Sequence, residues 1–171
     1  MQHPLRLLIT GCISLVFASF IHAQNHPAYQ VHTSDVVHFW QAFDSVQTTN
    51  DPARQIALIQ KIYVDQGTQG LKEFMELRGG NAEKWQKMMV EDKERMLKIR
   101  PYTLSLVQQQ PVIEQKLAIL KSIYPDFKPG DIFFTIGVGN SGGTVEGLHV
   151  LIGAEVTASE KPNWAVPIVL H

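Results

Sequence analysis

The sequence predicts an α+β fold, with a helical region first and a small antiparallel sheet after it. Two observations lead to this prediction. Apolar residues recur with helical spacing from residue 34 to residue 123, and two short apolar segments separated by glycines follow. The chain has 171 residues, enough for one domain with its own core. We expect a single domain over 24–171, in which the sheet packs on the helices.

The first residues have the pattern of a secretory signal peptide. A positive charge within Met1–Arg6 precedes an almost wholly apolar stretch from Leu7 to Phe20. Ile21-His22-Ala23 then offers a small residue for cleavage, so we expect a signal peptide over 1–23. The apolar stretch is shorter than the ~20 residues that span a bilayer as a helix. The protein is therefore expected to be exported.

The single cysteine, Cys12, leaves lipidation open as an alternative to cleavage after Ala23. Ile9-Thr10-Gly11 before it is similar to a lipoprotein cleavage box, but the apolar run continues past Cys12. A lipoprotein box follows its apolar core, so cleavage after Ala23 is favoured. The mature chain would then contain no cysteine, which excludes a disulfide and a thiol nucleophile.

Charge and composition exclude one class of partner. The formal net charge is -1, the pI is about 6.6, and no basic run or basic-aromatic patch is present. Nucleic acid is therefore excluded as a partner. The sequence leaves association with an inner or outer membrane open.

Caps and breakers set the expected helices. After a polar, loosely structured lead-in over 24–33, Thr33 or Ser34 can cap a helix that reaches Val46. Asp51-Pro52 has the N-cap and first-position residues of a second helix, which ends near Tyr63.

Three further helices are expected after the turn at 65–70. A short helix over Leu71–Arg78 stops at Gly79-Gly80. Asn81 caps the next one, which Arg100-Pro101 ends or kinks, and Gln110-Pro111 opens the last.

Two strands are expected near the end of the chain, over 132–136 and 148–152. Ile132 and Phe134 share one face of the first, and His149 lies on the polar face of the second. Their short separation favours an antiparallel hairpin over Asp131–Glu155. The residues between them contain five glycines, at 137, 139, 142, 143 and 147.

The glycine-rich segment is unlike a nucleotide-binding loop. It lacks the lysine of a P-loop, and a strand rather than a helix follows it. We interpret it as a connection between strands or as an edge that lines a ligand cleft. Ser141 is not within a Gly-x-Ser-x-Gly elbow, so it is not expected to be a nucleophile.

Most histidines are not expected to bind a metal. His26 and His32 lie in the polar lead-in, and His38 is expected on a helix surface. His149 and Glu155 would share a strand face, but six positions is too far for one ion without strand curvature.

His171 is different because of the residues before it. Ile168-Val-Leu-His171 is typical of the approach to a His-Glu-x-x-His helix. Histidines four residues apart lie on one helix face, where both can bind zinc while the glutamate activates the bound water.

Several segments together resemble an uncharacterised group of bacterial envelope proteins predicted to be zinc-dependent proteases. That family is zincin-like and distantly similar to the gliding-motility lipoprotein GldB. The segments are Ile123-Tyr-Pro-Asp-Phe, Ile132-Phe-Phe-Thr-Ile-Gly, Asn140-Ser-Gly-Gly-Thr, Leu151-Ile-Gly-Ala-Glu155, Phe39-Trp-Gln-Ala-Phe-Asp44 and Gly70-Leu-Lys-Glu-Phe74.

The resemblance implies a zincin-like domain of the periplasm or cell envelope that is incomplete in this chain. His171 would be the first histidine of the motif and a zinc ligand. The glutamate and the second histidine would follow it, so the chain alone is expected to be inactive and to contain no catalytic residue. A peptide or protein substrate would lie along the Asp131–Glu155 hairpin.

Two alternatives stay open beside the metallopeptidase. One is a non-catalytic envelope protein that binds a partner on the same scaffold. The other is a small-ligand binding protein that uses the glycine-rich segment. We also expect apolar strand residues, namely Ile132, Phe134, Val150 and Ile152, to be left partly uncovered if the metal helix is missing.

Overall fold

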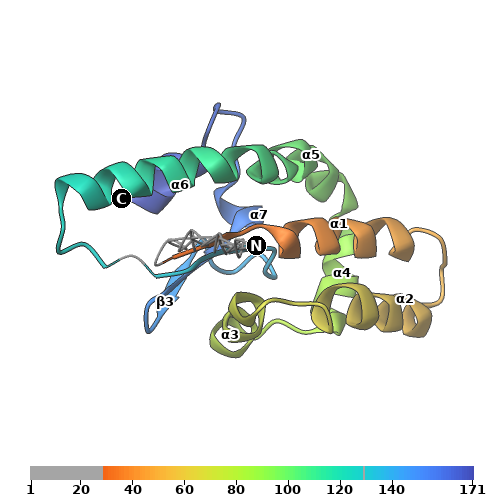
Figure 1. Cartoon of the computed structure of the whole chain (residues 1–171). Coiled ribbons are helices and arrows are strands. Elements are labelled where there is room, and N and C mark those ends of the chain that lie inside the picture. The colour runs from red at the N-terminus through yellow and green to blue at the C-terminus, as the bar shows by residue number, and fades with distance from the viewer. Residues whose placement is uncertain (1–28, 129) are drawn as a thin grey trace, which may run out of the picture.

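The computed structural model describes residues 29–128 and 130–171 and confirms the α+β fold (Figure 1). The expected signal peptide over 1–23, with Cys12, and also His26 lie outside the described residues. The helices are α1 (Ser34–Val46), α2 (Pro52–Ile59), α3 (Gln69–Arg78), α4 (Ala82–Glu91), α5 (Lys93–Leu104), α6 (Leu106–Ile123), α7 (Ala154–Thr157) and α8 (Ala165–Leu170), with a π-helical turn η1 (Gln60–Val64) after α2. The strands are β1 (Val31–His32), β2 (Ile132–Thr135), β3 (Thr144–Glu146) and β4 (His149–Gly153).

The sheet has the strand order β1-β2-β4-β3 and is mostly parallel. β2 pairs in parallel with both neighbours, as Ile132 lies opposite Val31 on β1 and opposite Val150 on β4. Only β3 is antiparallel, with Val145 opposite Val150. The predicted antiparallel pairing of 132–136 with 148–152 is therefore wrong, and the hairpin of this region is β3–β4.

The apolar sequence of β2 is typical of a strand in a parallel sheet. Ile132, Phe133 and Phe134 are apolar at consecutive positions, so both faces of the strand need cover. All four residues of β2 are buried. The chain returns along β3 and turns at Gly147, whose φ of 57° is in the left-handed region that glycine tolerates. That return allows β4 to pair with β2 in the same direction.

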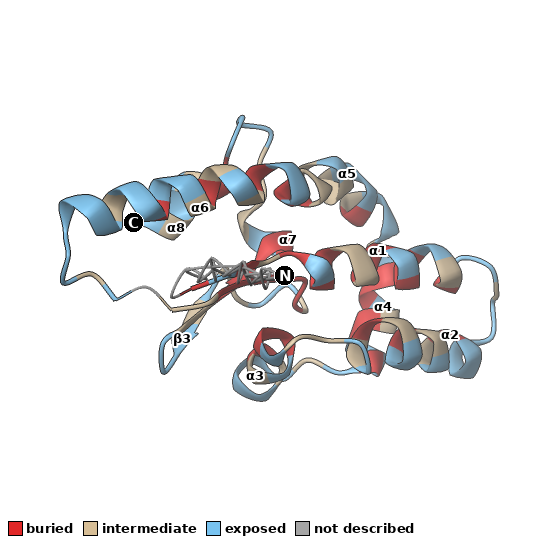
Figure 2. Ribbon diagram, in the orientation of Figure 1, coloured by how far each residue is buried: buried red, intermediate tan, exposed pale blue. Residues whose placement is uncertain are grey.

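Helices cover the sheet on both faces (Figures 1 and 2). On one, which we call the main-core face, Phe134 meets the Trp164 ring edge-on at 6.3 Å between centroids. Helices α1, α6 and α8 contribute to the same core, with residues that include Phe39, Ile113 and Ala165. Helix α3 lies on the opposite face, which we call the α3 face.

The α3 face has a small apolar cluster of its own, formed by Phe74, Phe133 and Leu151. Gly70 makes the contact between α3 and β2 possible. A Cβ atom at Gly70 would lie 2.1 Å from Cγ of Phe133, closer than any real contact. The missing side chain therefore sets how closely α3 can approach the sheet.

The expected loss of cover does not occur at three of the four strand residues, and the fourth, Val150, is partly buried. Ile132, Phe134 and Ile152 are at most 3% exposed, because α6, α8 and the segment before β1 close the main-core face. The exposed large apolar residues near the sheet are instead Val145 and Leu148, at the β3–β4 turn.

The lead-in to α1 is more ordered than predicted. Tyr29 and Val31 are buried, and Val31–His32 forms the edge strand β1. The amide of Gln30 donates to Oδ1 of Asp131 at 2.8 Å, which ties this segment to the start of β2.

Several predicted helix ends are confirmed. Oδ1 of Asp51 accepts the amide of Ala53, Oδ1 of Asn81 accepts that of Lys84, and Gly79 ends α3 in the left-handed conformation.

The helix boundaries predicted at two prolines are wrong. Pro101 lies inside α5 and does not end a helix, and Pro111 lies inside α6 and does not begin one. A proline leaves the carbonyl four residues earlier without its helical partner. Here those carbonyls belong to Leu97 and Val107, which are exposed residues on the surface of their helices, where water can satisfy them.

Candidate functional site

Helix α8 leads directly into His171, and its start is anchored. Nε1 of Trp164 donates to the carbonyl of Tyr102 at 3.1 Å. The amide of Ala165 donates to Oε1 of Gln109 at 3.0 Å. The helix therefore begins at a fixed point beside α6 and the main-core face, and His171 follows its last residue as an exposed side chain.

Across residues 29–128 and 130–171, no three His, Cys, Asp or Glu side chains lie close enough together to hold a metal ion. His171 is thus one imidazole without companion ligands in this part of the chain. One ligand does not hold zinc, which takes four in structural sites and three in catalytic ones.

His149 and Glu155 do not form the pair that a shared strand face would give. His149 begins β4, whereas Glu155 lies in the first turn of α7. Glu155 is not on the strand because the chain turns at Gly153 and becomes helical.

His149 instead bridges to α3. Its Nδ1 lies 2.8 Å from Oε2 of Glu73, and both side chains are at most one-third exposed. Burial raises the pKa of Glu73, but hydrogen bonds from Gln69 and His149 outweigh this effect and hold the pKa below its ordinary value. The pair therefore fastens α3 to the sheet.

His32 forms a second histidine–carboxylate pair on the same face. The prediction that His32 is solvated in the lead-in is therefore wrong. Its Nε2 lies 3.1 Å from Oδ2 of Asp131. The ring stacks on Phe133 at 4.3 Å, and His149 meets Phe133 edge-on at 5.2 Å. Two histidine–carboxylate pairs thus flank one aromatic ring on the α3 face.

His38 is half-buried on α1, rather than on the helix surface as predicted. Its Nδ1 has no hydrogen-bond partner among the described residues, and neither does Oγ1 of the buried Thr135.

Glu155 is a buried carboxylate, 4% exposed, that holds the glycine-rich segment in place. Its Oε2 accepts the amide of Gly137 at 2.9 Å, and its Oε1 accepts the amide of Gly139 at 3.0 Å. Burial raises the pKa of Glu155 above its ordinary value, and these amide hydrogen bonds oppose the rise. Two backbone donors that a phosphate would need are therefore taken by the protein's own glutamate.

Other side chains fix the same loop. Nε1 of Trp85 donates to the carbonyl of Gly137 at 2.7 Å, and the hydroxyl of Tyr63 donates to the carbonyl of Ile136 at 2.7 Å. Nδ2 of Asn140 donates to the carbonyl of Arg78 at 2.8 Å. The loop is thus attached to α4, η1, α3 and α7. It connects β2 to β3, a strand that lies inside the glycine-rich segment and was not predicted.

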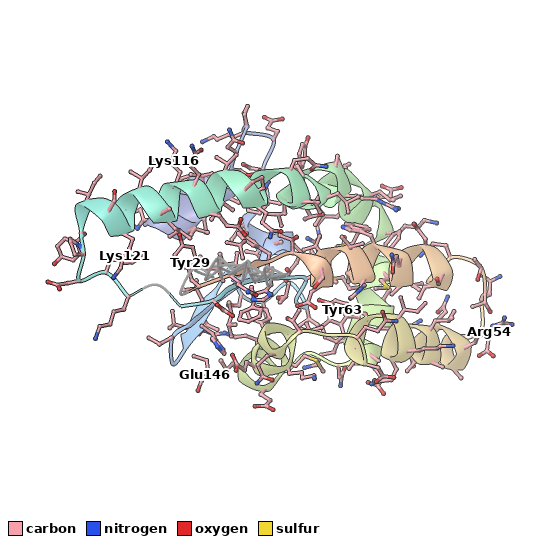
Figure 3. All side chains as sticks on the ribbon, in the orientation of Figure 1. Tyr29, Arg54, Tyr63, Lys116, Lys121 and Glu146 are labelled. Carbon is pink, nitrogen blue, oxygen red and sulfur yellow. The ribbon has the colours of Figure 1, made fainter. Side chains whose placement is uncertain are left out.

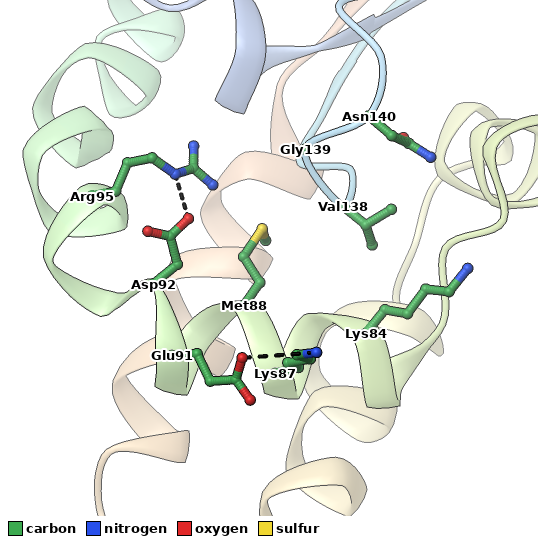
Figure 4. Close-up of a pocket in the computed structure, with 9 residues that line it drawn as sticks. All are labelled: Lys84, Lys87, Met88, Glu91, Asp92, Arg95, Val138, Gly139 and Asn140. Atoms are coloured by element: carbon green, nitrogen blue, oxygen red, sulfur yellow. Dashed lines mark hydrogen bonds and ion pairs between the residues drawn. The ribbon is translucent and has the colours of Figure 1, made fainter.

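An open cleft of about 650 Å³ lies between this loop and the helices α4 and α5 (Figure 4). This volume is in the range of small-molecule sites. Met88 and Val138 give it an apolar part, and charged side chains from both helices surround them. The charged residues are Lys84, Lys87, Glu91, Asp92 and Arg95.

The charges of the cleft do not cancel. Three cationic and two anionic side chains line it, which leaves one positive charge. Lys87 lies 3.8 Å from Glu91, and Nε of Arg95 donates to Oδ2 of Asp92. Nζ of Lys84 donates to the carbonyl of Gly79, a neutral partner.

Strand β3 forms one edge of the sheet, beside β4. Val145 and Glu146 are exposed, and Figure 3 shows Glu146 on the β3–β4 hairpin. An edge strand has backbone donors and acceptors that a further strand can pair with.

Some of these residues could not be singled out from the sequence. The partners of His149 and Glu155 lie 76 and up to 18 positions away, with no local motif that links them. Arg95 belongs to a charge run that is typical of a solvated helix face. The glycine-rich segment is the one usable signal: it is expected as a possible edge of a ligand cleft, and three of its residues, Val138, Gly139 and Asn140, line the open cleft beside α4 and α5.

No helix in the described part of the chain is both long and apolar enough to cross a membrane. Comparison of the chain with protein-family models, with curated proteins and with solved structures gives no match.

Proposed function

We propose that this chain is the exported, N-terminal portion of a zinc-dependent metallopeptidase in which His171 is the first zinc ligand. The observation that carries the proposal is helix α8. The residues before His171 are helical, as the His-Glu-x-x-His motif requires, and the helix starts from an anchored position.

The helical geometry before His171 suits a zinc motif. If the helix continued, His171 and the residue four positions later would lie on the same face. Bound zinc would lower the pKa of a coordinated water and so supply the nucleophile for hydrolysis. The chain's own contribution would be to hold the first ligand at the end of α8. Every other ligand and the general base would come from residues after His171.

The edge strand β3 supports the proposal that the substrate is a peptide. Among the described residues β3 pairs on one side only, with β4, and two of its three residues are exposed. An extended peptide could add there as a further strand, through backbone hydrogen bonds. The substrate edge would then be β3 alone, a narrower site than the whole Asp131–Glu155 segment.

Reading the encoding DNA past the codon for His171 tests the proposal. We expect the reading frame to continue with Glu-x-x-His directly after His171. A stop codon, or a continuation without that motif, would contradict the metallopeptidase.

A non-catalytic binding protein of the envelope is the second candidate. The preformed cleft beside the glycine-rich loop favours it. The two candidates differ in peptidase activity. The product of the complete reading frame should cleave an unfolded protein substrate, and a chelator should abolish this activity only if the first proposal holds.

A further inference from the structure

We propose that the cleft between α4, the start of α5 and the glycine-rich loop binds a ligand that ends in a carboxylate. This inference is independent of the metallopeptidase function, because the cleft shares no residue with α8, His171 or β3. Figure 4 shows the two walls of the cleft. Arg95 and Lys84 lie on the helical wall, and Val138, Gly139 and Asn140 lie on the loop wall.

Arg95 is the group that would bind the anion. Its Nε is engaged by Asp92, which fixes the plane of the guanidinium. Nη1 and Nη2 have no hydrogen-bond partner among the described residues, so they present a pair of parallel donors. Such a fork matches the two oxygens of a carboxylate.

Arg95 faces the loop across the cleft. A Cβ atom built at Gly139 would have Nη2 of Arg95 as its nearest neighbour, at 3.9 Å. Gly139 therefore brings the loop backbone close to the guanidinium, and both face the same open cleft. Gly139 has a φ of 80°, which a side-chain-bearing residue rarely adopts, so this close approach is built into the loop conformation.

The loop wall is rigid before any ligand binds. Trp85, Glu155 and Asn140 each hold it by hydrogen bonds of 2.7–3.0 Å. A preformed wall reduces the entropy lost on binding. Because Glu155 already occupies the amides of Gly137 and Gly139, those two amides are not available to a ligand, and Arg95 is the cation best placed to meet its negative charge.

The remaining lining determines the rest of the ligand. The paired end nitrogens of Arg95 suit a single carboxylate, and Met88 with Val138 offers an apolar contact. The ligand is therefore a carboxylate next to an apolar group, as in a peptide that ends in leucine or in a short fatty acid. Those two sources share the chemistry and can be separated experimentally.

The test is a titration of the purified, ¹⁵N-labelled chain, followed by amide chemical shifts. The probes are Ala-Ala-Leu, its C-terminal amide, hexanoate and inorganic phosphate. We expect the free-acid peptide or hexanoate, or both, to shift the amides of Arg95 and Gly139 saturably, with Kd on the order of 1 mM. The peptide amide lacks the carboxylate and should leave those amides unchanged. Binding of hexanoate alone would identify a small acid as the source, and binding of the peptide alone a chain terminus.

Matched variants assign the site. Arg95→Gln should weaken binding by about tenfold or more, and Arg95→Lys should weaken it less because it keeps the charge but loses the fork. Lys98→Gln is the control, since Lys98 is an exposed cation on the same helix that does not line the cleft, and its effect should stay within about twofold. Unchanged melting temperatures would show that the variants are folded.

Four results would overturn the proposal, and three of them concern the carboxylate probes and the Arg95 variant. One is no saturable shift with either carboxylate, and another is equal binding of the peptide and its amide. The third is unchanged affinity in folded Arg95→Gln. Tighter binding of phosphate than of both carboxylates would also reject the carboxylate class and assign a phosphate site.

Discussion

The two faces of the sheet are closed by different means. On the main-core face, apolar side chains from β2 and β4 join a large continuous core with α1, α6 and α8. On the α3 face, only Phe74, Phe133 and Leu151 form an apolar cluster, and the pairs His149–Glu73 and His32–Asp131 stand beside it. One face therefore depends on buried area, and the other on close fit and polar contacts that change with pH.

This difference determines which helix separates first from the sheet. Apolar burial contributes about 25 cal/mol for each Å² and hardly depends on pH. Half-exposed ion pairs contribute only about 0–1 kcal/mol each and weaken as their groups titrate. We expect α3 to open from the sheet at lower cost than α6 and α8.

The largest effect should come from the main-core face. Phe134→Ala removes a fully buried ring that contacts Trp164, and should lower the free energy of unfolding by about 3–5 kcal/mol. Urea denaturation followed by tryptophan fluorescence measures this. Tyr124→Ala, at an exposed position, is the control and should change stability by no more than about 0.5 kcal/mol. A loss below about 1 kcal/mol for Phe134→Ala would mean that this face is not the core.

An intermediate effect is expected where α3 fits against β2. Gly70→Ala would push a methyl group into Phe133, and should cost about 1–3 kcal/mol although alanine favours helix formation. Lys72→Ala, exposed on the same helix, is the matched control. Adding Phe133→Ala should make room for the methyl group, so the double variant should be more stable than the sum of the two losses predicts. Strict additivity would contradict the close contact.

The smallest effect should come from the pair that fastens α3. The pKa of Glu73 lies below its ordinary value, so its stabilisation is complete above the unfolded-state pKa and is lost as the pH falls through the folded-state pKa. Glu73→Gln should therefore cost about 0.5–1 kcal/mol at pH 7. That difference should shrink as the pH falls through the folded-state pKa of Glu73, because the protonated glutamate is then uncharged like the glutamine.

Hydrogen exchange can show which helix loses stability in Glu73→Gln. In Glu73→Gln, amides of α3 should exchange faster at pH 7, and amides of α6 should not. Glu76→Gln, an exposed position on α3, is the control. Equal acceleration in both helices would mean that α3 does not open separately from α6.

Local chemistry made much of the helical region predictable. The caps at Asp51 and Asn81 and the stop at Gly79 depend on neighbouring residues only. The helix boundaries predicted at the prolines are wrong because the sequence does not show which side of a helix faces water. Pro101 and Pro111 are tolerated where the freed carbonyl belongs to an exposed residue.

The sheet and its surroundings were harder to predict, since they depend on contacts between distant residues. Consecutive apolar positions in β2 favour a strand buried on both faces, whereas the period-two spacing of Ile132, Phe134 and Ile136 predicts a strand with one buried face. Val31–His32 is too short to stand out from a polar lead-in, although it pairs with residues 101 positions later. The cleft likewise joins α4 and α5 to a loop more than 40 positions away, and its charged residues are typical of any solvated helix.

The most direct test of the proposed metallopeptidase is the zinc content of the product of the complete reading frame, measured by elemental analysis after purification without added metal. The proposal predicts about one zinc per chain, lost in His171→Gln and retained in His149→Gln. Absence of zinc, or one zinc per chain that remains in folded His171→Gln, would contradict it.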